Sequence, residues 1–159
     1  MRYLGESPWD RLRSCSKAMK GISLLSALSR GRNLFGYVPY PESVLEGFYK
    51  EAIKNGLNIM RIFDALNDID NIKSSIRLIN ELGGIADAAV CYTVDPKGAD
   101  EKIFTDEYFV NKAKEMESIG AKMITLKDMA GLVNPARIHS LMPKLKEALS
   151  VPVDFHTHC

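Results

Sequence analysis

Five short apolar segments recur along this sequence at intervals of roughly 30 residues, which is the length of one β-strand plus one α-helix. The segments begin near residues 22, 58, 85, 122 and 151. Apolar residues at helical spacing, bounded by capping and turn residues, predict helices at about 8–20, 43–55, 70–82, 105–119 and 135–149. Pro143 is expected to kink or split the last helix. Repeated strand–helix units favour an α/β fold with a parallel sheet.

Each of the five predicted strands ends in a polar residue. The residues are Arg30, Asp64, Thr93, Lys127 and His156. Both an open doubly wound sheet and a closed (β/α)₈ barrel use repeated strand–helix units. No GxGxxG motif follows the first strand, which argues against a dinucleotide-binding sheet. Polar residues at every strand end favour a TIM barrel, whose active site lies at the carboxyl ends of its strands.

The chain of 159 residues is short for such a barrel, which needs eight strands and typically about 250 residues. We therefore expect residues 1–159 to form one incomplete barrel domain, about five parallel strands with intervening helices, that lacks upstream and downstream strands. Unpaired strand edges would leave this piece marginally stable, and an incomplete site would leave it inactive by itself.

The composition excludes several classes of partner. The net charge is +1, which gives no reason to expect nucleic acid or an anionic membrane surface as a partner. No apolar run approaches the ~20 residues of a membrane span, and the first residues lack a signal-peptide pattern. The cysteines, Cys15, Cys91 and Cys159, are few and widely spaced, which predicts reduced thiols in a cytoplasmic protein.

The chemistry is expected at the last two strand ends. His156 and His158 lie on one face of a strand, because side chains alternate with period two, and their nitrogens can hold a zinc-like ion. Asp154 lies on the same face. The alternative is that both histidines are ordinary polar residues at a strand end. Lys127 is either paired with Asp128 or Asp64, or neutral through burial and able to form a carbamate that ligates metal.

Arg30 ends the first strand and precedes Gly31, with Tyr37 nearby. A guanidinium group at a barrel mouth can bind a substrate carboxylate with two hydrogen bonds. The alternative is a salt bridge between Arg30 and Asp64. Arg61 and Asp64 are three residues apart and therefore face opposite sides of the chain, which predicts different roles for them.

Four motifs occur in an order and at a spacing that resemble a known family. They lie at residues 30–37 (RGRNLFGY), 61–68 (RIFDALND), 127–131 (KDMAG) and 156–158 (HTH), and residues 1–9 (MRYLGESPW) match as well. Together they resemble the carboxyltransferase domain of biotin-dependent enzymes, which include pyruvate carboxylase, the α subunit of oxaloacetate decarboxylase and the 5S subunit of transcarboxylase. The resemblance covers essentially the whole chain.

The resemblance implies a (β/α)₈ barrel with a divalent ion, Zn, Mn or Co, at its mouth. The implied ligands are Lys127, as a carboxylated lysine, with His156 and His158. Arg30 would bind the oxo-acid substrate and Tyr37 would lie near the biotin pocket, so that Lys127 and Arg30 are the implied catalytic residues. The implied reaction is carboxyl transfer between carboxybiotin and pyruvate or oxaloacetate. Biotin would be carried on a partner domain or subunit, and the full-length protein would be a homo-oligomer.

Two alternatives remain open at this point. The chain can be a truncated and inactive scaffold, because the family's aspartate ligand, a further arginine and a glutamine would precede Met1, and its proton-shuttling threonine would follow Cys159. It can also be a related metal-dependent acyl-CoA lyase or synthase, since those barrels share the HxH motif. They lack a lysine at the position of Lys127, which favours the biotin-dependent group.

Overall fold

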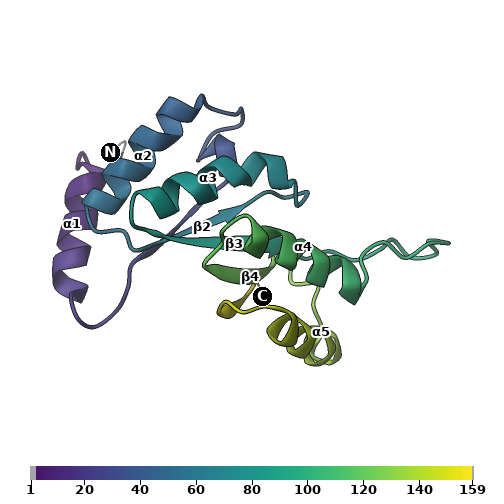
Figure 1. The fold of residues 1–159 in the computed structure, drawn as a ribbon. Helices are drawn as coiled ribbons and strands as arrows, with labels where there is room; N and C mark the ends of the chain where they lie inside the picture. The colour runs from purple at the N-terminus through teal and green to yellow at the C-terminus, as the bar shows by residue number, and fades with distance from the viewer. Residues whose placement is uncertain (1–2, 159) are drawn as a thin grey trace.

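The computed structural model describes residues 3–158, so the predictions for Met1, Arg2 and Cys159 lie outside the described residues. Strands and helices alternate as the sequence indicates (Figure 1). In chain order the elements are α1 (Pro8–Met19), β1 (Ser26–Ser29), the short 3₁₀ helix η1 (Gly31–Asn33), α2 (Glu42–Lys54), β2 (Ile59–Phe63), α3 (Ile69–Glu81), β3 (Ile85–Cys91), α4 (Asp106–Ser118), β4 (Met123–Asp128), α5 (Pro135–Ala148) and β5 (Val153–Thr157).

The strands form one sheet in the order β1-β2-β3-β4-β5, and each neighbouring pair is parallel. A doubly wound sheet reverses its strand order at a switch point, whereas a barrel adds each strand beside the previous one. The sheet follows the second pattern and is not closed. The predicted α/β class with five parallel strands is confirmed, and the architecture is that expected for part of a barrel.

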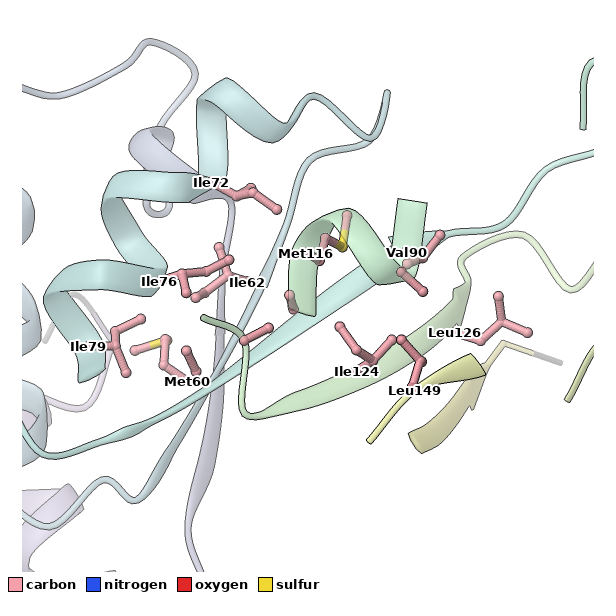
Figure 2. Packing of buried hydrophobic residues seen from close by; sticks show 14 of the residues in the cluster. Met60, Ile62, Ile72, Ile76, Ile79, Val90, Met116, Ile124, Leu126 and Leu149 are labelled. Carbon is pink, nitrogen blue, oxygen red and sulfur yellow. The ribbon is translucent and has the colours of Figure 1, made fainter. Parts of the chain in front are cut away.

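One face of the sheet carries the hydrophobic core. The register aligns Met60 with Ala86 and Ile62 with Ala88, and Ile124 and Leu126 of β4 continue the same face. In Figure 2, Ile72, Ile76 and Ile79 of α3 point toward Met60 and Ile62, while Met116 of α4 lies beside them. All these side chains are at most 1% exposed. Burial of this face against α2 to α5 therefore fixes which residues point to the other face.

Side-chain caps start four of the helices. Ser7, Thr105 and Asn134 accept hydrogen bonds from backbone amides in the first turns of α1, α4 and α5. Helix α3 starts at Ile69 with Asp68 as its cap, so the predicted cap at Asp70 is wrong. Asp70 lies inside the first turn, where its carboxylate suits the positive end of the helix dipole.

The predicted strand from residue 22 is too long at its start. The amides of Ile22 and Ser23 bond to the carbonyl of Met19, so this segment closes α1 instead of pairing with β2. Ile22 is 78% exposed for the same reason. The last strand starts at Val153 rather than near Val151, because the amides of Ser150 and Val151 bond to Glu117.

Two further features differ from simple helix patterns. Pro143 lies inside α5 on its exposed side, and it does not split the helix.

Helix α1 buries none of its residues fully, although Trp9 and Leu12 pack against the edge of the core. An apolar pocket of about 640 Å³ lies between this helix, β1 and α2.

Within residues 3–158, the helices are too short or too polar to cross a lipid bilayer.

Candidate metal and substrate site

The polar residues that could bind a ligand or take part in catalysis lie on the second face of the sheet, opposite the core. Register pairs Lys127 of β4 with His156 of β5, and alternation along β5 places Asp154, His156 and His158 on the same side. This is the carboxyl end of the strands, where barrel enzymes place their active sites. The sequence prediction that Lys127 and the two histidines lie together is consistent with this arrangement.

Three nitrogen atoms lie close together here. Nε2 of His156 is 2.8 Å from Nε2 of His158 and 3.3 Å from Nζ of Lys127. Two nitrogens 2.8 Å apart that each bind one ion at about 2.0–2.1 Å would subtend roughly 85–90° at it. The two imidazoles therefore fit a shared divalent ion. Within the described residues, no group of three His, Cys, Asp or Glu side chains is placed to hold a metal, and the side chain beside the two histidine rings is that of Lys127.

Lys127 is buried beside an aromatic ring. It is 4% exposed, and its Nζ lies 5.2 Å from the centre of the Phe63 ring. In residues 3–158, no carboxylate lies within ion-pair distance of this Nζ, so the alternative of pairing with Asp128 or Asp64 is wrong. Burial lowers the pKa of Lys127, and the charge of Arg61 lowers it further.

The surroundings of His156 lower the pKa of its imidazole as well. Burial lowers the pKa of its imidazole, and the nearby positive charges of Lys127 and Arg61 act in the same direction, whereas Asp154 opposes them. A neutral imidazole keeps a lone pair that can bind a metal ion.

Arg61 is the centre of a hydrogen-bonded network that adjoins the imidazole ring of His156. Its Nε donates to Oδ2 of Asp87 at 2.6 Å, and its Nη2 donates to Asp154. Its Nη1 lies 3.4 Å from Nδ1 of His156. Thr125 donates its hydroxyl to both carboxylate oxygens of Asp87 at 2.8 and 3.0 Å. The network spans β2, β3, β4 and β5.

Sequence reasoning missed Asp87 and Thr125. Asp87 is 0% exposed and lies between Ala86 and Ala88 in a strand of small apolar residues. A charged residue within such a strand is costly unless it is paired, and that signal indicates a partner on a neighbouring strand. Burial raises the pKa of Asp87, and its ion pair with Arg61 opposes the rise.

Arg30 and Tyr37 line a second pocket of about 230 Å³, together with Phe63 and Asp64. The carboxylate of Asp64 accepts bonds from the amides of Leu66 and Asp68 and from Nδ2 of Asn71. In the described part of the chain the Arg30 side chain forms no ion pair, so the proposed salt bridge to Asp64 is wrong. The guanidinium is exposed and available to a ligand.

The ring of Phe63 adjoins both the pocket of Arg30 and the amine of Lys127. Phe63 is therefore a residue that the pocket of Arg30 and the surroundings of Lys127 have in common.

Two motif glycines hold the site's backbone in place. Gly31 has φ +51°, and a Cβ at this position would clash with the backbone carbonyl of Asn71 in α3. Gly131 has φ +65°, and a Cβ there would clash with the carbonyl oxygen of His158. Glycine is needed at both positions because of the positive φ and the close approach. The first contact positions the loop that carries Arg30 and Tyr37, and the second positions the end of β5.

No protein-family model matches the chain. Known proteins do match it over its whole length. It is 42% identical over 159 residues to a pyruvate carboxylase subunit from Methanocaldococcus jannaschii, covering 100% of this chain and 27% of that protein. It is 38% identical over 160 residues to the 2-oxoglutarate carboxylase large subunit of Hydrogenobacter thermophilus, covering 99% of this chain and 24% of that protein. The chain thus spans about a quarter of the length of these relatives.

A solved structure shows the same fold. The carboxyl transferase domain of Rhizobium etli pyruvate carboxylase, solved with pyruvate and biocytin, superposes with a TM-score of 0.92 at 39% identity. The match covers 99% of this chain and 26% of that chain. Matching sequence, strand order and helix order lead to one conclusion: the chain belongs to the carboxyltransferase-domain family of the biotin-dependent carboxylases, of which it spans one part.

Proposed function

We propose that this chain forms part of a biotin-dependent carboxyltransferase that moves a carboxyl group between carboxybiotin and pyruvate or oxaloacetate. The observation that carries the proposal is the convergence of Nζ of Lys127 with the Nε2 atoms of His156 and His158 beside the pocket of Arg30. The family relationship supports it, because pyruvate carboxylases match the whole chain.

In this proposal Lys127, His156 and His158 hold a divalent ion, Zn, Mn or Co, with Lys127 as a carbamate. The two imidazole nitrogens are close enough to share an ion. Burial of Lys127 supports carbamate formation, because only the neutral amine reacts with carbon dioxide. A carbamate adds oxygen ligands and a negative charge that a free amine cannot offer. When bound, the ion supplies Lewis-acid polarisation of the substrate's carbonyl group.

Arg30 binds the substrate carboxylate in this proposal, since its guanidinium is exposed in the pocket and free of acidic partners in residues 3–158. Arg61 does not suit this role, because its donors are engaged by Asp87 and Asp154. Tyr37 is 94% exposed at the rim of the same pocket, where it can contact the biotin ring.

The transfer requires one exchange of bonds. In the carboxylating direction the methyl carbon of pyruvate loses a proton and forms a bond to the carboxyl carbon, while the bond from that carbon to the biotin nitrogen breaks and the nitrogen takes the proton. The role of Arg30 is to orient the oxo acid so that its methyl carbon faces the carboxyl group. Biotin would arrive on a carrier domain or subunit, and the full-length protein would be a cytoplasmic homo-oligomer whose further strands complete the barrel.

2-Oxoglutarate is the second candidate substrate, because one relative is the large subunit of a 2-oxoglutarate carboxylase. Pyruvate and 2-oxoglutarate share the oxo-acid group that Arg30 would bind. They differ in the second carboxylate of 2-oxoglutarate.

The experiment measures the binding of metal and of substrate to this chain. The purified chain, its Lys127→Ala variant and a Lys122→Ala control are loaded with Mn²⁺ in bicarbonate buffer, and bound metal is measured by elemental analysis. Lys122 is exposed just before the same strand, so it controls for the replacement of a lysine by alanine away from the site. Relaxation of the pyruvate and 2-oxoglutarate protons then reports which oxo acid binds near the bound Mn²⁺.

We expect about one Mn²⁺ per chain in the parent and in Lys122→Ala, and a large loss in Lys127→Ala. Enhanced relaxation of the pyruvate methyl protons would support pyruvate as the substrate, and enhancement for 2-oxoglutarate alone would replace it by the alternative. A parent chain that binds no metal, or a Lys127→Ala variant that binds as much as the parent, would overturn the proposed site.

A further inference from the structure

Arg30 and Asp64 carry opposite charges and line the same pocket of about 230 Å³, yet in residues 3–158 they form no ion pair. The arrangement is unexpected, because opposite charges that share a small pocket attract one another. An ion pair between them would occupy the guanidinium donors that the carboxylate of a ligand needs. The contacts that hold the carboxylate of Asp64 therefore decide whether Arg30 is available.

Three donors hold this carboxylate. Oδ1 of Asp64 accepts hydrogen bonds from the backbone amides of Leu66 and Asp68, at 2.8 and 3.1 Å. Oδ2 has a single donor in the described chain, which is Nδ2 of Asn71 at 2.9 Å. Oδ2 is thus the oxygen that becomes available to Arg30 if the amide of Asn71 is lost.

The position of Asn71 is fixed by its surroundings. It lies in the first turn of α3, next to Ile72, which is completely buried in the core (Figure 2). Its Nδ2 also donates to Oδ1 of Asn33 at 3.3 Å, and its backbone carbonyl lies against Gly31. Asn33 and Gly31 both belong to η1. A single residue thus joins α3, η1 and the carboxylate.

We infer that Asn71 is a positioning residue that holds the carboxylate of Asp64 away from Arg30. The guanidinium is thereby kept free for the carboxylate of the oxo acid, a consequence that rests on the proposed function. A side chain without a donor at position 71 releases Oδ2 of Asp64, which then pairs with Arg30 across the pocket.

A rescue experiment separates this role from a purely structural one. If Asn71 only stabilised α3 and the loop beside it, a change at Asp64 would not repair the loss of its amide. If Asn71 holds Asp64 away from Arg30, removal of the Asp64 charge frees the guanidinium again. The double variant Asn71→Leu/Asp64→Asn therefore gives opposite results under the two explanations.

The experiment treats the chain with phenylglyoxal, which reacts with free guanidinium groups, and mass spectrometry measures the rate of modification at each arginine. Each variant is labelled with and without pyruvate. Arg32 is the internal reference, because it is exposed and does not line the pocket. Arg61 reports unfolding, because only 16% of its side chain is exposed in the folded chain.

Asn80→Leu is the matched control for Asn71→Leu. Asn80 also lies in α3 and donates from Nδ2, to the carbonyl of Gly120 at 2.7 Å, but it does not line the pocket. Leucine has the branched shape of asparagine and offers no hydrogen bond. Asn71→Ala is the second variant at this position, because alanine removes the donor and has the highest helix propensity.

We expect phenylglyoxal to modify Arg30 about fivefold more slowly in Asn71→Leu than in the parent, relative to Arg32, which corresponds to an ion pair at the strong end of the surface range. Asn80→Leu should label like the parent. Pyruvate should slow the labelling of Arg30 in the parent and have little effect in Asn71→Leu. In the double variant with Asp64→Asn, fast labelling and protection by pyruvate should both return.

Two results would overturn the inference. One is labelling of Arg30 at the parent's rate in both Asn71→Leu and Asn71→Ala, with Arg61 still slow and the fold therefore intact. The other is slow labelling of Arg30 that persists in the double variant. If pyruvate does not protect Arg30 in the parent, the proposed substrate contact fails, while the rates without pyruvate still decide whether Asn71 holds Asp64 away.

Discussion

Lys127 and Asp128 are neighbours in the sequence with opposite charges, yet their side chains point to opposite faces of β4 and do not pair. Nζ of Lys127 lies 3.3 Å from Nε2 of His156 on the polar face. The carboxylate of Asp128 accepts bonds from the amides of Leu132 and Val133 at 2.9 and 3.0 Å. The first residue is therefore available for chemistry, while the second holds the loop that follows the strand.

Asp128→Asn should destabilise the chain without removing its metal-binding nitrogens. Burial opposes ionisation of Asp128, but the bonds from Leu132, Val133 and Thr157 outweigh it and lower its pKa. We expect a loss of about 1–3 kcal/mol in unfolding free energy at neutral pH, measured by urea unfolding, with exposed Asp100→Asn unchanged.

The same pKa shift predicts a pH dependence. A carboxyl group with a lowered folded pKa contributes stability above its unfolded pKa of about 3.9, and the contribution disappears as the pH falls through the folded pKa. The difference in unfolding free energy between the parent and Asp128→Asn should therefore shrink below pH 4. A difference that stays constant down to pH 2 would contradict this assignment.

Arg30→Gln should weaken binding of pyruvate by about 10–100-fold, the usual effect of losing a charge-assisted bidentate pair. The matched control is Arg32→Gln, because Arg32 is also exposed but does not line the pocket. Proton relaxation of pyruvate in the presence of the Mn²⁺-loaded chain measures the affinity. Equal weakening in both variants would indicate a general effect of charge rather than a specific contact.

Cys91 should resist alkylation while Cys15 reacts. Cys15 is exposed and Cys91 is buried. Burial raises the pKa of Cys91 to about 12, so almost no reactive thiolate exists at pH 8. Mass spectrometry after iodoacetamide treatment should find modified Cys15 in the folded chain and modification at both sites in urea. Rapid labelling of Cys91 in the folded chain would show that β3 is less well covered than the structure indicates.

Pro143→Ala should stabilise the chain. Pro143 lies on the exposed side of α5, and it cannot donate a hydrogen bond to the preceding turn. Alanine is the better helix former by about 3 kcal/mol, and the greater freedom of the unfolded chain removes up to about 1 kcal/mol of that gain. We expect a net increase of about 2 kcal/mol in unfolding free energy by urea denaturation. No change would mean that α5 already accommodates the proline by a local bend.

The sequence alone predicted the order of strands and helices, because the periodicity of apolar residues records local backbone geometry directly. It also predicted that Lys127, His156 and His158 lie together, since alternation along a strand and the carboxyl ends of parallel strands are local properties. The sequence predicted the wrong ends for three elements, at Ile22, Asp70 and Val151. At each place the backbone amide donates its hydrogen bond to an acceptor other than the one the predicted element requires.

Only the tertiary structure decided which charges pair. Arg30 was an equal candidate for an ion pair with Asp64, and Arg61 had no assigned partner. In the described chain Arg61 forms the ion-pair network with Asp87 and Asp154, and Arg30 forms no ion pair. Asp87 and Asp154 lie 26 and 93 residues from Arg61 along the chain. Such partners meet only through strand register across the sheet, and register depends on burying the opposite face in the core, which no local pattern specifies.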